Sequence, residues 1–453
     1  MLKFIIDWVN DPASEQNVLW LRSLPGSGKS ALSTTIANMF GDAGRLGAFL
    51  FFDRDVTERS NLTFVIRTLA NQLGASDPGI RAAIRAVLGR NQNILMSYFH
   101  LQFKRLILDT LLTVELLPPA FVIVLDALDE CGTADECKAL LAVLAKDLAT
   151  LPVSIRTVIT SHAEIDIHNA FEGQPNILPL ELDITSQANS DDILLYFRYR
   201  MELICTQGGY LRLGIGWPGE ENFRQLVQRV SGLFVWASTA SDFINGHDPP
   251  KCLDVILNGG SACGAEAALD VLYKTALSSA GHWDDTDFVS DFRDIVGIIL
   301  IARRPLSCTA IDKLLHMPEH RPSIYTISIV GCVLRQSSAV HVLHPSFADF
   351  LMDQKRCSRD IWSFDPSMYH QNLAYRCLDR MDVVLHHNIC NLTLTADLAT
   401  ESLPKDISYS CMFWVDHLCI IEDDILPIID LLCVFLRQHL LHWFEAMSIL
   451  RRS

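Results

Sequence analysis

The chain has 453 residues, 49% of them hydrophobic and 20% charged, and its formal net charge is −16. This composition excludes an intrinsically disordered chain, and the length exceeds what one hydrophobic core serves, so about two to four domains are expected. The acidic balance argues against a protein that wraps nucleic acid or an anionic membrane by bulk electrostatics, and no nucleic-acid partner is expected.

Three further patterns narrow the class of protein. The 13 cysteines are scattered, without a Cys-x-x-Cys pair or the Cys/His spacing of a zinc site, which indicates reduced and mostly buried thiols. No run of about 18 apolar residues is free of charge, so no transmembrane span is expected. The apolar start of the chain is too short for a signal peptide. These patterns predict a cytoplasmic protein.

Residues 1–185 alternate strand-like and helix-like segments, which is typical of an α/β domain with a parallel sheet. Each strand-like segment is a nearly continuous apolar run, as expected of a strand that is covered on both faces. The five expected strands are residues 18–21, 48–52, 121–125, 156–160 and 177–180. Amphipathic stretches between them, such as residues 62–73, place apolar residues at helical spacing.

A glycine-rich turn follows the first expected strand and precedes an expected helix. The turn and the first helical positions are Leu24, Pro25, Gly26, Ser27, Gly28, Lys29, Ser30 and Ala31. Strand, glycine turn, Gly-Lys-Ser and helix form the layout of a phosphate-binding P-loop, which predicts a nucleotide site rather than a plain surface loop. Gly26 and Gly28 permit backbone angles that gather N–H groups into an anion-binding nest, and the helix N-terminus adds its own N–H groups.

The side chains that close this turn have separate expected roles. Lys29 would bring positive charge to the β- and γ-phosphates, and the Ser30 hydroxyl would ligate Mg²⁺. One position departs from the pattern, because Ser23 stands where the first P-loop glycine is expected. The expected ligands are ATP or ADP, with GTP as a further candidate, together with Mg²⁺.

The third expected strand leads into a run of acids. Asp126 ends the strand, and Asp129 and Glu130 follow one turn later. Beside a P-loop, Asp126 would hold the metal through water, and Asp129 and Glu130 would polarise an attacking water as general base. The alternative is a plain strand followed by an acidic helix start, since acids favour the first helical turn. The P-loop upstream favours the catalytic interpretation.

The fourth expected strand ends in Thr160-Ser161-His162. Its position after the acidic strand could place the Thr160 hydroxyl near a γ-phosphate. A polar strand end without such a role is common and is the alternative.

Strand signals fade after residue 185, and most of the remaining chain is expected to be helical. A smaller mixed unit is expected at about residues 288–352, with short strand-like pieces near 327–334 and 340–343.

With these elements placed, the chain resembles a NACHT-type NTPase of the STAND class, in the fungal form related to nephrocystin's N-terminal NTPase region. The similarity covers nearly all of the chain. Its segments include Ile6-Asp7-Trp8, Phe51-Phe52-Asp53-Arg54-Asp55, Val124-Leu125-Asp126-Ala127-Leu128-Asp129-Glu130-Cys131, Gly232-Leu233-Phe234-Val235-Trp236-Ala237, His344-Pro345-Ser346 and Asn388-Ile389-Cys390.

The resemblance implies an α/β P-loop NTPase with a parallel five-stranded sheet, followed by helical, winged-helix and further helical segments. The expected domains are an NTPase core at 1–185, a helical domain at 186–262, a winged-helix-like domain at 263–356 and a helical region at 357–453. In such proteins ADP holds the winged-helix part against the core, and exchange for ATP releases it to form homo-oligomers and meet protein partners. By this resemblance His344 would contact the β-phosphate of ADP, whereas an ordinary buried histidine is the alternative.

Three departures accompany the resemblance. Ser23 replaces a P-loop glycine, and His162 stands where the family commonly has an arginine, which would weaken γ-phosphate sensing or hydrolysis. The family usually carries an N-terminal effector and C-terminal repeats, so a short form or a truncated gene product is expected.

Three functions are therefore weighed. The first is a signalling switch of the fungal innate-immunity or incompatibility type, with slow ATP hydrolysis as its only enzymatic activity. The second is a non-hydrolysing scaffold or protein-interaction module that holds its nucleotide. The third is a mechanochemical ATPase of the AAA+ kind, which would need an arginine finger that the sequence does not identify.

Overall fold

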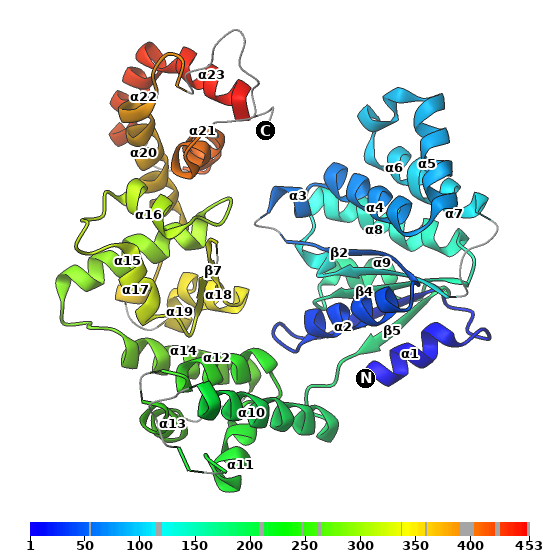
Figure 1. Ribbon diagram of the computed structural model, residues 1–453, viewed down its shortest axis with the longest axis horizontal. Coiled ribbons are helices and arrows are strands. Elements are labelled where there is room, and N and C mark those ends of the chain that lie inside the picture. Colours follow the sequence, from blue (N-terminus) through cyan, green and yellow to red (C-terminus); the bar gives the residue numbers. More distant parts are fainter. Residues whose placement is uncertain are drawn as a thin grey trace. The chain divides into compact units, whose positions relative to one another are not determined.

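The computed structural model describes residues 1–53, 56–114, 120–207, 213–214, 216–246, 248–260, 264–336, 338–357, 360–389, 403–421 and 426–450. The chain forms two compact units, drawn in Figure 1 and described separately below. Unit 1 is Met1–Ile193 with Gly232–Val235, and unit 2 is Leu194–Ser231 with Trp236–Ser453. Residues 54–55 and 390, which carry part of the family resemblance, lie outside the described residues.

Unit 1 is built on the predicted five-stranded parallel sheet, with strand order β2-β3-β4-β1-β5. The strands are β1 (Val18–Arg22), β2 (Leu46–Phe51), β3 (Phe121–Asp126), β4 (Ile155–Ser161) and β5 (Ile177–Glu181). Because every pairing is parallel, the carboxyl ends of all five strands meet at one edge. The P-loop, the acidic turn and Thr160 each end or follow a strand, so the topology brings them to that edge.

Helices cover both faces of this sheet (Figure 1). Helices α1 (Leu2–Asn10) and α2 (Lys29–Asp42) share a core with Leu19, Val124 and Val158 on one face. The opposite face, which includes Trp20, carries the larger core, built with α4, α8 and α9. Burial on both faces explains why the strands are apolar throughout rather than alternating.

Three of the longer helices of unit 1 begin at side-chain caps that the sequence supplies. Asn61 accepts a hydrogen bond at the start of α4, Asp77 does so at α5, and Thr133 with Glu136 forms a capping box at α8. The remaining elements of unit 1 are α3 (Thr57–Ser60), α4 (Leu62–Ser76), α5 (Pro78–Arg90), η1 (Gln92–Met96), α6 (Phe99–Phe103), η2 (Lys104–Leu108), α7 (Asp109–Thr113), η3 (Leu128–Glu130), α8 (Ala134–Asp147), η4 (Leu148–Thr150) and α9 (Ile165–Phe171).

Unit 2 is mostly helical, as expected. Its elements, with two helices that it shares with unit 1, are α10 (Gln187–Gln207), α11 (Glu220–Arg229), α12 (Phe234–Ile244), α13 (Pro249–Asn258), α14 (Ala265–Ala280), α15 (Thr286–Ile301), α16 (Cys308–Leu315), α17 (Ser323–Ile329), β6 (Leu334–Gln336), β7 (Val340–Val342), α18 (Pro345–Met352), α19 (Gln354–Cys357), η5 (Asp360–Trp362), α20 (Pro366–Val384), α21 (Lys405–Leu418), α22 (Leu426–Gln438) and α23 (Leu440–Leu450).

The mixed segment of unit 2 consists of α15, α16 and α17 followed by an antiparallel hairpin of β6 and β7. The Val340 N–H donates to the Leu306 carbonyl at 2.8 Å, which adds one extended residue beside the hairpin. This order is typical of a winged helix, although the residue bounds of the four expected domains stay predictions. The expected strand at 327–334 is wrong in its first part, because residues 327–329 end helix α17.

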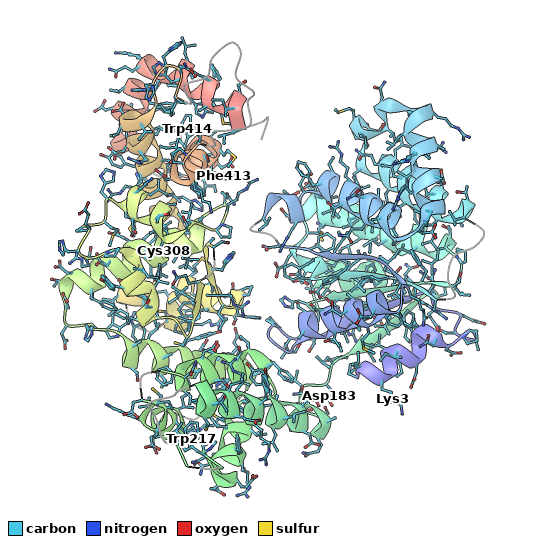
Figure 2. The ribbon with its side chains drawn as sticks, viewed as in Figure 1. Lys3, Asp183, Trp217, Cys308, Phe413 and Trp414 are labelled. Atoms are coloured by element: carbon cyan, nitrogen blue, oxygen red, sulfur yellow. The ribbon has the colours of Figure 1, made fainter. Side chains whose placement is uncertain are left out.

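Aromatic side chains build the core of the C-terminal part of unit 2. Figure 2 labels Phe413 and Trp414 on α21. The Trp414 ring lies 5.4 Å from that of Phe435 on α22 and 5.7 Å from that of Trp443 on α23, centroid to centroid. None of the helices that the structure describes has both the length and the apolarity that crossing a membrane would need. The described cysteines are all free thiols.

Candidate nucleotide site

The glycine turn after β1 adopts the backbone that its sequence predicts. Gly26 and Gly28 have φ angles of +75° and +95°, in the region that other residues seldom enter. Gly28 is the N-cap of α2, so the unpaired N–H groups of the first helical turn follow it directly. A Cβ atom built on Gly28 would stand 3.3 Å from the Phe234 ring. Both backbone angle and close packing therefore favour glycine at this position.

Ser23, the departure from the P-loop pattern, sits in this turn without distorting it. Ser23 is not among the residues with positive φ, so a glycine is not required for its backbone. Its hydroxyl donates to the Leu182 carbonyl at 3.1 Å and ties the turn to the segment after β5. The replacement thus leaves the Gly26–Gly28 backbone in place.

Lys29 lies folded over the turn and is buried. Its ammonium donates to the carbonyls of Ser23 and Leu24, each at 2.9 Å. Burial lowers the pKa of Lys29 to about 8, against the opposing effect of the carboxylates of Asp129, Asp126 and Glu130. Ser30 follows at the exposed start of α2. A cation held by two neutral carbonyls in a desolvated place is suited to an anionic ligand.

Asp126, at the end of β3, is fully buried. Its Oδ1 atom lies 2.6 Å from the Ser33 hydroxyl on α2 and 2.5 Å from the Thr160 hydroxyl on β4. Its Oδ2 atom is buried and has no hydrogen-bond partner among the described residues. One oxygen therefore anchors the carboxylate to two elements, and the other is left for a ligand such as metal-bound water.

Thr160 holds the turn that follows Asp126. Its hydroxyl is buried, donates to Asp126 and accepts the Ala127 N–H at 3.0 Å. Ala127 has a φ of +57°, a strained backbone for a residue with a Cβ atom. The geometry thus supports Thr160 as the group that orients Asp126. The contact with a γ-phosphate stays a prediction.

The acidic turn η3 and the end of β4 are joined by a pair that sequence reasoning missed. The Asp129 carboxylate accepts the His162 N–H at 2.8 Å on Oδ1, and His162 Nδ1 lies 3.0 Å from Oδ2. Burial works against ionisation of Asp129, but the bonds from His162 outweigh it and lower the pKa of the carboxyl. Glu130 follows on the same turn and is half-buried. The two acids, treated alike in the sequence, thus have different surroundings.

Residues 232–235 return to this site from far along the chain. The Val235 N–H donates to the Gly26 carbonyl at 3.0 Å, and the Phe234 ring packs on Gly28. Gly232 has a φ of +82° and packs closely on Ile184. A Cβ atom built on Gly232 would stand 2.1 Å from the carbonyl oxygen of Ile184. Residues 232–237 are part of the family resemblance. Nothing local in the sequence, however, indicates that they pack against the P-loop.

His344 belongs to unit 2 and has a local structural role there. It is the N-cap of α18, and its Nδ1 atom accepts the Ser346 N–H at 3.2 Å. Nδ1 also lies 2.8 Å from the Ser346 hydroxyl, which in turn lies 2.8 Å from the Tyr273 hydroxyl. This network supplies hydrogen-bond partners for the Nδ1 atom of His344. The contact of His344 with ADP stays a prediction.

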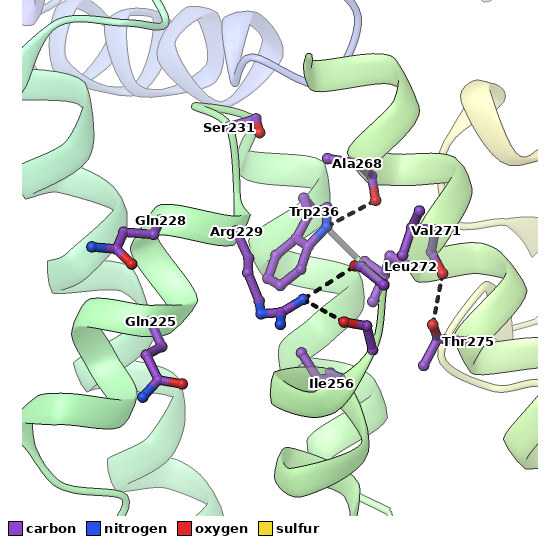
Figure 3. Close-up of a pocket in the computed structure, with 12 residues that line it drawn as sticks. Gln225, Gln228, Arg229, Ser231, Trp236, Ile256, Ala268, Val271, Leu272 and Thr275 are labelled. Carbon is purple, nitrogen blue, oxygen red and sulfur yellow. Dashed lines mark hydrogen bonds between the residues drawn. The ribbon is translucent and has the colours of Figure 1, made fainter. Parts of the chain in front are cut away.

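A cavity of about 340 Å³ lies within unit 2 (Figure 3). The Arg229 guanidinium beside it donates to the carbonyls of Leu257, Gly259 and Gly260, and so caps the C-terminus of α13. The Trp236 indole donates to the Ala268 carbonyl. Arg229 thus links α11 to α13 and Trp236 links α12 to α14, and none of the predicted site residues lines the cavity.

The described residues contain no group of three His, Cys, Asp or Glu side chains that could hold a metal by themselves. A Mg²⁺ ion at Ser30 and Asp126 would depend on phosphate and water oxygens for its other ligands. This is the usual manner of Mg²⁺ binding in nucleotide sites, and the unpartnered Asp126 oxygen fits it.

Comparison with known proteins agrees with this geometry. Residues 3–162 match the family described as "Nephrocystin 3, N-terminal". This part of the chain, which carries the P-loop, is similar to that family. The match spans β1 to β4 and ends at His162, so it includes the P-loop, the acidic turn and Thr160.

The similarity to a curated protein extends past residue 162. The chain is 23% identical to the "Vegetative incompatibility protein HET-E-1" of Podospora anserina over 477 aligned positions, which cover 96% of this chain. The match covers 34% of that protein, so the chain spans about a third of its relative's length. The crystal structure of Cdc6p from Pyrobaculum aerophilum matches with a TM-score of 0.35 and 12% identity, over 75% of this chain and 87% of that one.

Proposed function

We propose that this chain is a nucleotide-dependent signalling switch of the NACHT type, which binds ATP or ADP with Mg²⁺ and hydrolyses ATP slowly. The observation that carries the proposal is the Asp126 carboxylate. It is fully buried, anchored through one oxygen to α2 and β4, and unpartnered at the other among the described residues. An unpartnered buried carboxylate oxygen is costly, so its presence at the P-loop edge supports a ligand that satisfies it.

Different groups of the turn would bind different parts of the Mg²⁺–nucleotide complex. The backbone of Gly26, Gly28 and the first turn of α2 would hold the phosphate oxygens, and Lys29 would exchange its two carbonyl partners for them. Ser30 and Asp126 would hold Mg²⁺, which supplies charge neutralisation for the phosphates when bound. Thr160 would act on this site through Asp126.

The surroundings of the two acids separate their proposed roles in hydrolysis. Both oxygens of Asp129 face His162, so Asp129 serves to lock the turn after β3 onto the end of β4. Glu130, half-buried on the same turn, is the better candidate for the base that orients water. With a histidine rather than an arginine at position 162, weaker charge stabilisation and slow turnover are expected.

The switch itself is supported by the relative's name, since HET-E-1 is called a vegetative incompatibility protein. We extend that role to this chain as part of the proposal: a cytoplasmic protein that changes conformation on nucleotide exchange, with His344 as an ADP contact and with protein partners or further copies on activation. Moving such an equilibrium from 1:99 to 99:1 takes about 5.5 kcal/mol of differential binding. A few charge-assisted hydrogen bonds of about 1.5–3 kcal/mol each suffice for it.

The second candidate is a scaffold that binds nucleotide without hydrolysing it. The Asp129–His162 pair favours it, because an acid that accepts the His162 N–H on one oxygen and faces the His162 imidazole with the other is less able to accept a proton from water. The two functions share the binding site and differ in turnover.

The test of binding is Lys29→Ala in the full chain, measured by calorimetric titration and thermal unfolding with MgATP and MgADP. Wild type should gain up to about 4 kcal/mol of stability at a thousandfold excess of nucleotide over Kd. The variant should lose this gain. Lys3→Ala, an exposed lysine on α1, is the matched control and should behave as wild type. Equal melting of wild type with and without both nucleotides would refute the proposed function.

The test of turnover separates switch from scaffold. Purified protein is denatured and the released nucleotide is identified by chromatography, before and after incubation with excess MgATP. Slow accumulation of ADP that is lost in Glu130→Gln supports the switch. ATP that persists unchanged over hours supports the scaffold.

A further inference from the structure

Helix α22 lies in the C-terminal part of unit 2 (Figure 1). It has a buried side and an exposed apolar side. Ile428 and Phe435 are 1% and 0% exposed, and the Phe435 ring packs edge-on against Trp414. The second side consists of Leu426, Ile429, Cys433 and Leu436, all of them exposed. We call these four residues the α22 stripe. Leu426 and Leu436 expose 69% and 43% of their surface.

The α22 stripe has the spacing of a helix–helix seam. Its members are separated by three, four and three residues, which places them in line along one side of a helix. In heptad terms they occupy alternating a and d positions, which are the positions that enter a partner helix as knobs. Exposed apolar side chains scattered singly need no explanation, but a continuous seam of them indicates a helical partner.

Two opposite charges flank the seam on one side. Asp430 and Arg437 each follow a d-position residue, so both occupy e positions. Both are exposed, and neither makes an ion pair with another residue that the structure describes. Charges at e positions choose the partner and its direction.

We propose that the α22 stripe binds the same stripe of a second copy of this chain, with the two helices antiparallel. In that arrangement Leu426 lies in one layer with Leu436 of the second copy, and Ile429 lies in one layer with Cys433 of the second copy. Helical side chains lean toward the N-terminus of their own helix, so Asp430 and Arg437 of the second copy lean toward each other. The twofold axis repeats this pair. A parallel arrangement would instead place Leu432 opposite Arg437, which leaves both charges without partners.

The contact is small and its affinity is correspondingly limited. Helix α22 has 13 residues, and a pair of such helices buries less than the roughly 1,200–2,000 Å² of a standard stable interface. The pairing therefore forms at high protein concentration, or where copies are already held together and the effective concentration is in the millimolar range. It is independent of the proposed nucleotide binding.

A cysteine introduced at position 429 tests the geometry in the full chain. Ile429→Cys places two thiols in one layer, the introduced thiol of one copy with native Cys433 of the other. Mild oxidation at about 50–100 μM protein, a concentration chosen for a weak pair, should give a covalent dimer on non-reducing gels. Val434→Cys, exposed on another side of α22, is the matched control and should stay monomeric. Adding Cys433→Ser to Ile429→Cys should abolish the dimer.

Charge reversal tests the direction of the pair. Asp430→Arg alone and Arg437→Asp alone should each lower the yield of the Ile429→Cys dimer, and weaken self-association in sedimentation equilibrium by about tenfold. The double reversal should restore both. Gln438→Arg adds a charge away from the seam and should change neither. Far-ultraviolet circular dichroism confirms that each variant remains folded.

Three outcomes overturn the proposal. Ile429→Cys could fail to cross-link while Val434→Cys does so. Wild type, which keeps Cys433, could cross-link as readily as Ile429→Cys, so that the covalent dimer would not depend on the layer of residues 429 and 433. The double charge reversal could fail to recover what the single reversals lose.

Discussion

The two units each bury a cluster of polar side chains, and the clusters differ in how completely they are satisfied. In unit 1, Asp126 Oδ2 and the Ser27 hydroxyl are buried at the P-loop edge without hydrogen-bond partners among the described residues. In unit 2, the buried Asp406 carboxylate receives Arg380 on one oxygen at 2.8 Å and Lys313 on the other at 3.4 Å. The first cluster leaves bonds for a ligand, whereas the second closes on itself.

A chain of hydrogen bonds beside Asp406 shows the same closure. The Tyr409 hydroxyl accepts the Arg303 N–H at 3.1 Å and can therefore donate to His417 Nε2, 2.8 Å away. With Nε2 as acceptor, a neutral His417 carries its proton on Nδ1 and donates it to His370 Nδ1 at 2.7 Å. The Tyr409 hydroxyl, both ring nitrogens of His417 and His370 Nδ1 are therefore all hydrogen-bonded. A network in which every polar atom is hydrogen-bonded stabilises a fold. A network that leaves a buried polar atom without a partner can bind a ligand that supplies the missing hydrogen bond.

The largest predicted effect breaks the closed cluster. Asp406→Ala should lower the free energy of unfolding by about 3 kcal/mol, because it leaves the Arg380 and Lys313 charges without their buried partner. Urea titration of the full chain, followed by tryptophan fluorescence, measures it. Asp416→Ala, an exposed acid on the same helix, should stay within about 0.5 kcal/mol of wild type. A loss of nucleotide binding in Asp406→Ala would contradict the separation of the two clusters.

The next effect concerns the open cluster and should fall on binding instead of stability. Asn at position 126 keeps an oxygen for Ser33 and Thr160 but removes the charge, so Mg²⁺-dependent affinity for ATP should fall by about 100-fold. Because the unpartnered charge is costly without a ligand, Asp126→Asn should unfold at the same urea concentration as wild type or a higher one. Calorimetric titration with and without Mg²⁺ checks the first part. A marked loss of stability would instead show that the Asp126 carboxylate stabilises the fold, as the Asp406 carboxylate does.

Acid should destabilise the closed cluster in a defined pH window. Burial, with the nearby Arg303 charge, lowers the pKa of His370 to about 4, and burial, with His370 and Arg303, lowers that of His417 to about 3. Below an unfolded pKa of about 6.5 the unfolded chain takes up protons that the folded chain refuses. The free energy of unfolding should therefore fall as pH drops from about 6.5 towards 4, by up to about 1.4 kcal/mol per pH unit for each histidine.

Urea titrations at several pH values between about 7.5 and 4.5 measure this slope. His370→Leu removes one titrating group and should reduce the slope by about half, whatever it does to stability at neutral pH. His168→Leu, a half-exposed histidine of unit 1, serves as the control and should leave the slope unchanged. Identical slopes in all three proteins would show that the buried pair does not govern acid unfolding.

The smallest effect sharpens the role of Thr160. Thr160→Val keeps the shape of the side chain but removes the hydroxyl that meets Asp126 and Ala127, which should cost about 1–2 kcal/mol of stability. Thr160→Ser retains the hydroxyl and should recover most of that loss. If Thr160 acts through Asp126, Thr160→Val should weaken MgATP binding more than binding of ATP without metal. Equal weakening of both would favour a direct phosphate contact.

Local patterns predicted much of unit 1. The five strands and the P-loop could be predicted because each depends on a short run of residues whose burial or backbone angle is decided nearby. The Asp129–His162 pair could not, since it depends on β3 and β4 lying side by side in one register. Phe234 and Val235 were missed for the same reason, because roughly two hundred residues separate them from the glycines they contact.

One local pattern was misleading. Residues 323–329 are rich in β-branched side chains, with Ile324, Thr326, Ile327 and Ile329, and such a run favours a strand. In the fold Ile327 and Thr326 are buried and the segment is helix α17. Packing with α15 and α16 outweighs the intrinsic preference, which is worth only a fraction of a kcal/mol per residue.

The boundary between the two units falls inside helices. Helix α10 crosses it between Ile193 and Leu194, and α12 crosses it between Val235 and Trp236. A helix resists bending, so each of these two helices is a stiff rod along its own length. Since α12 begins at Phe234 and Val235, on the backbone of Gly26 and Gly28, any tilt of that rod must either carry the phosphate loop along or break its first contacts. The start of α12 is thereby part of the structure that shapes the phosphate loop.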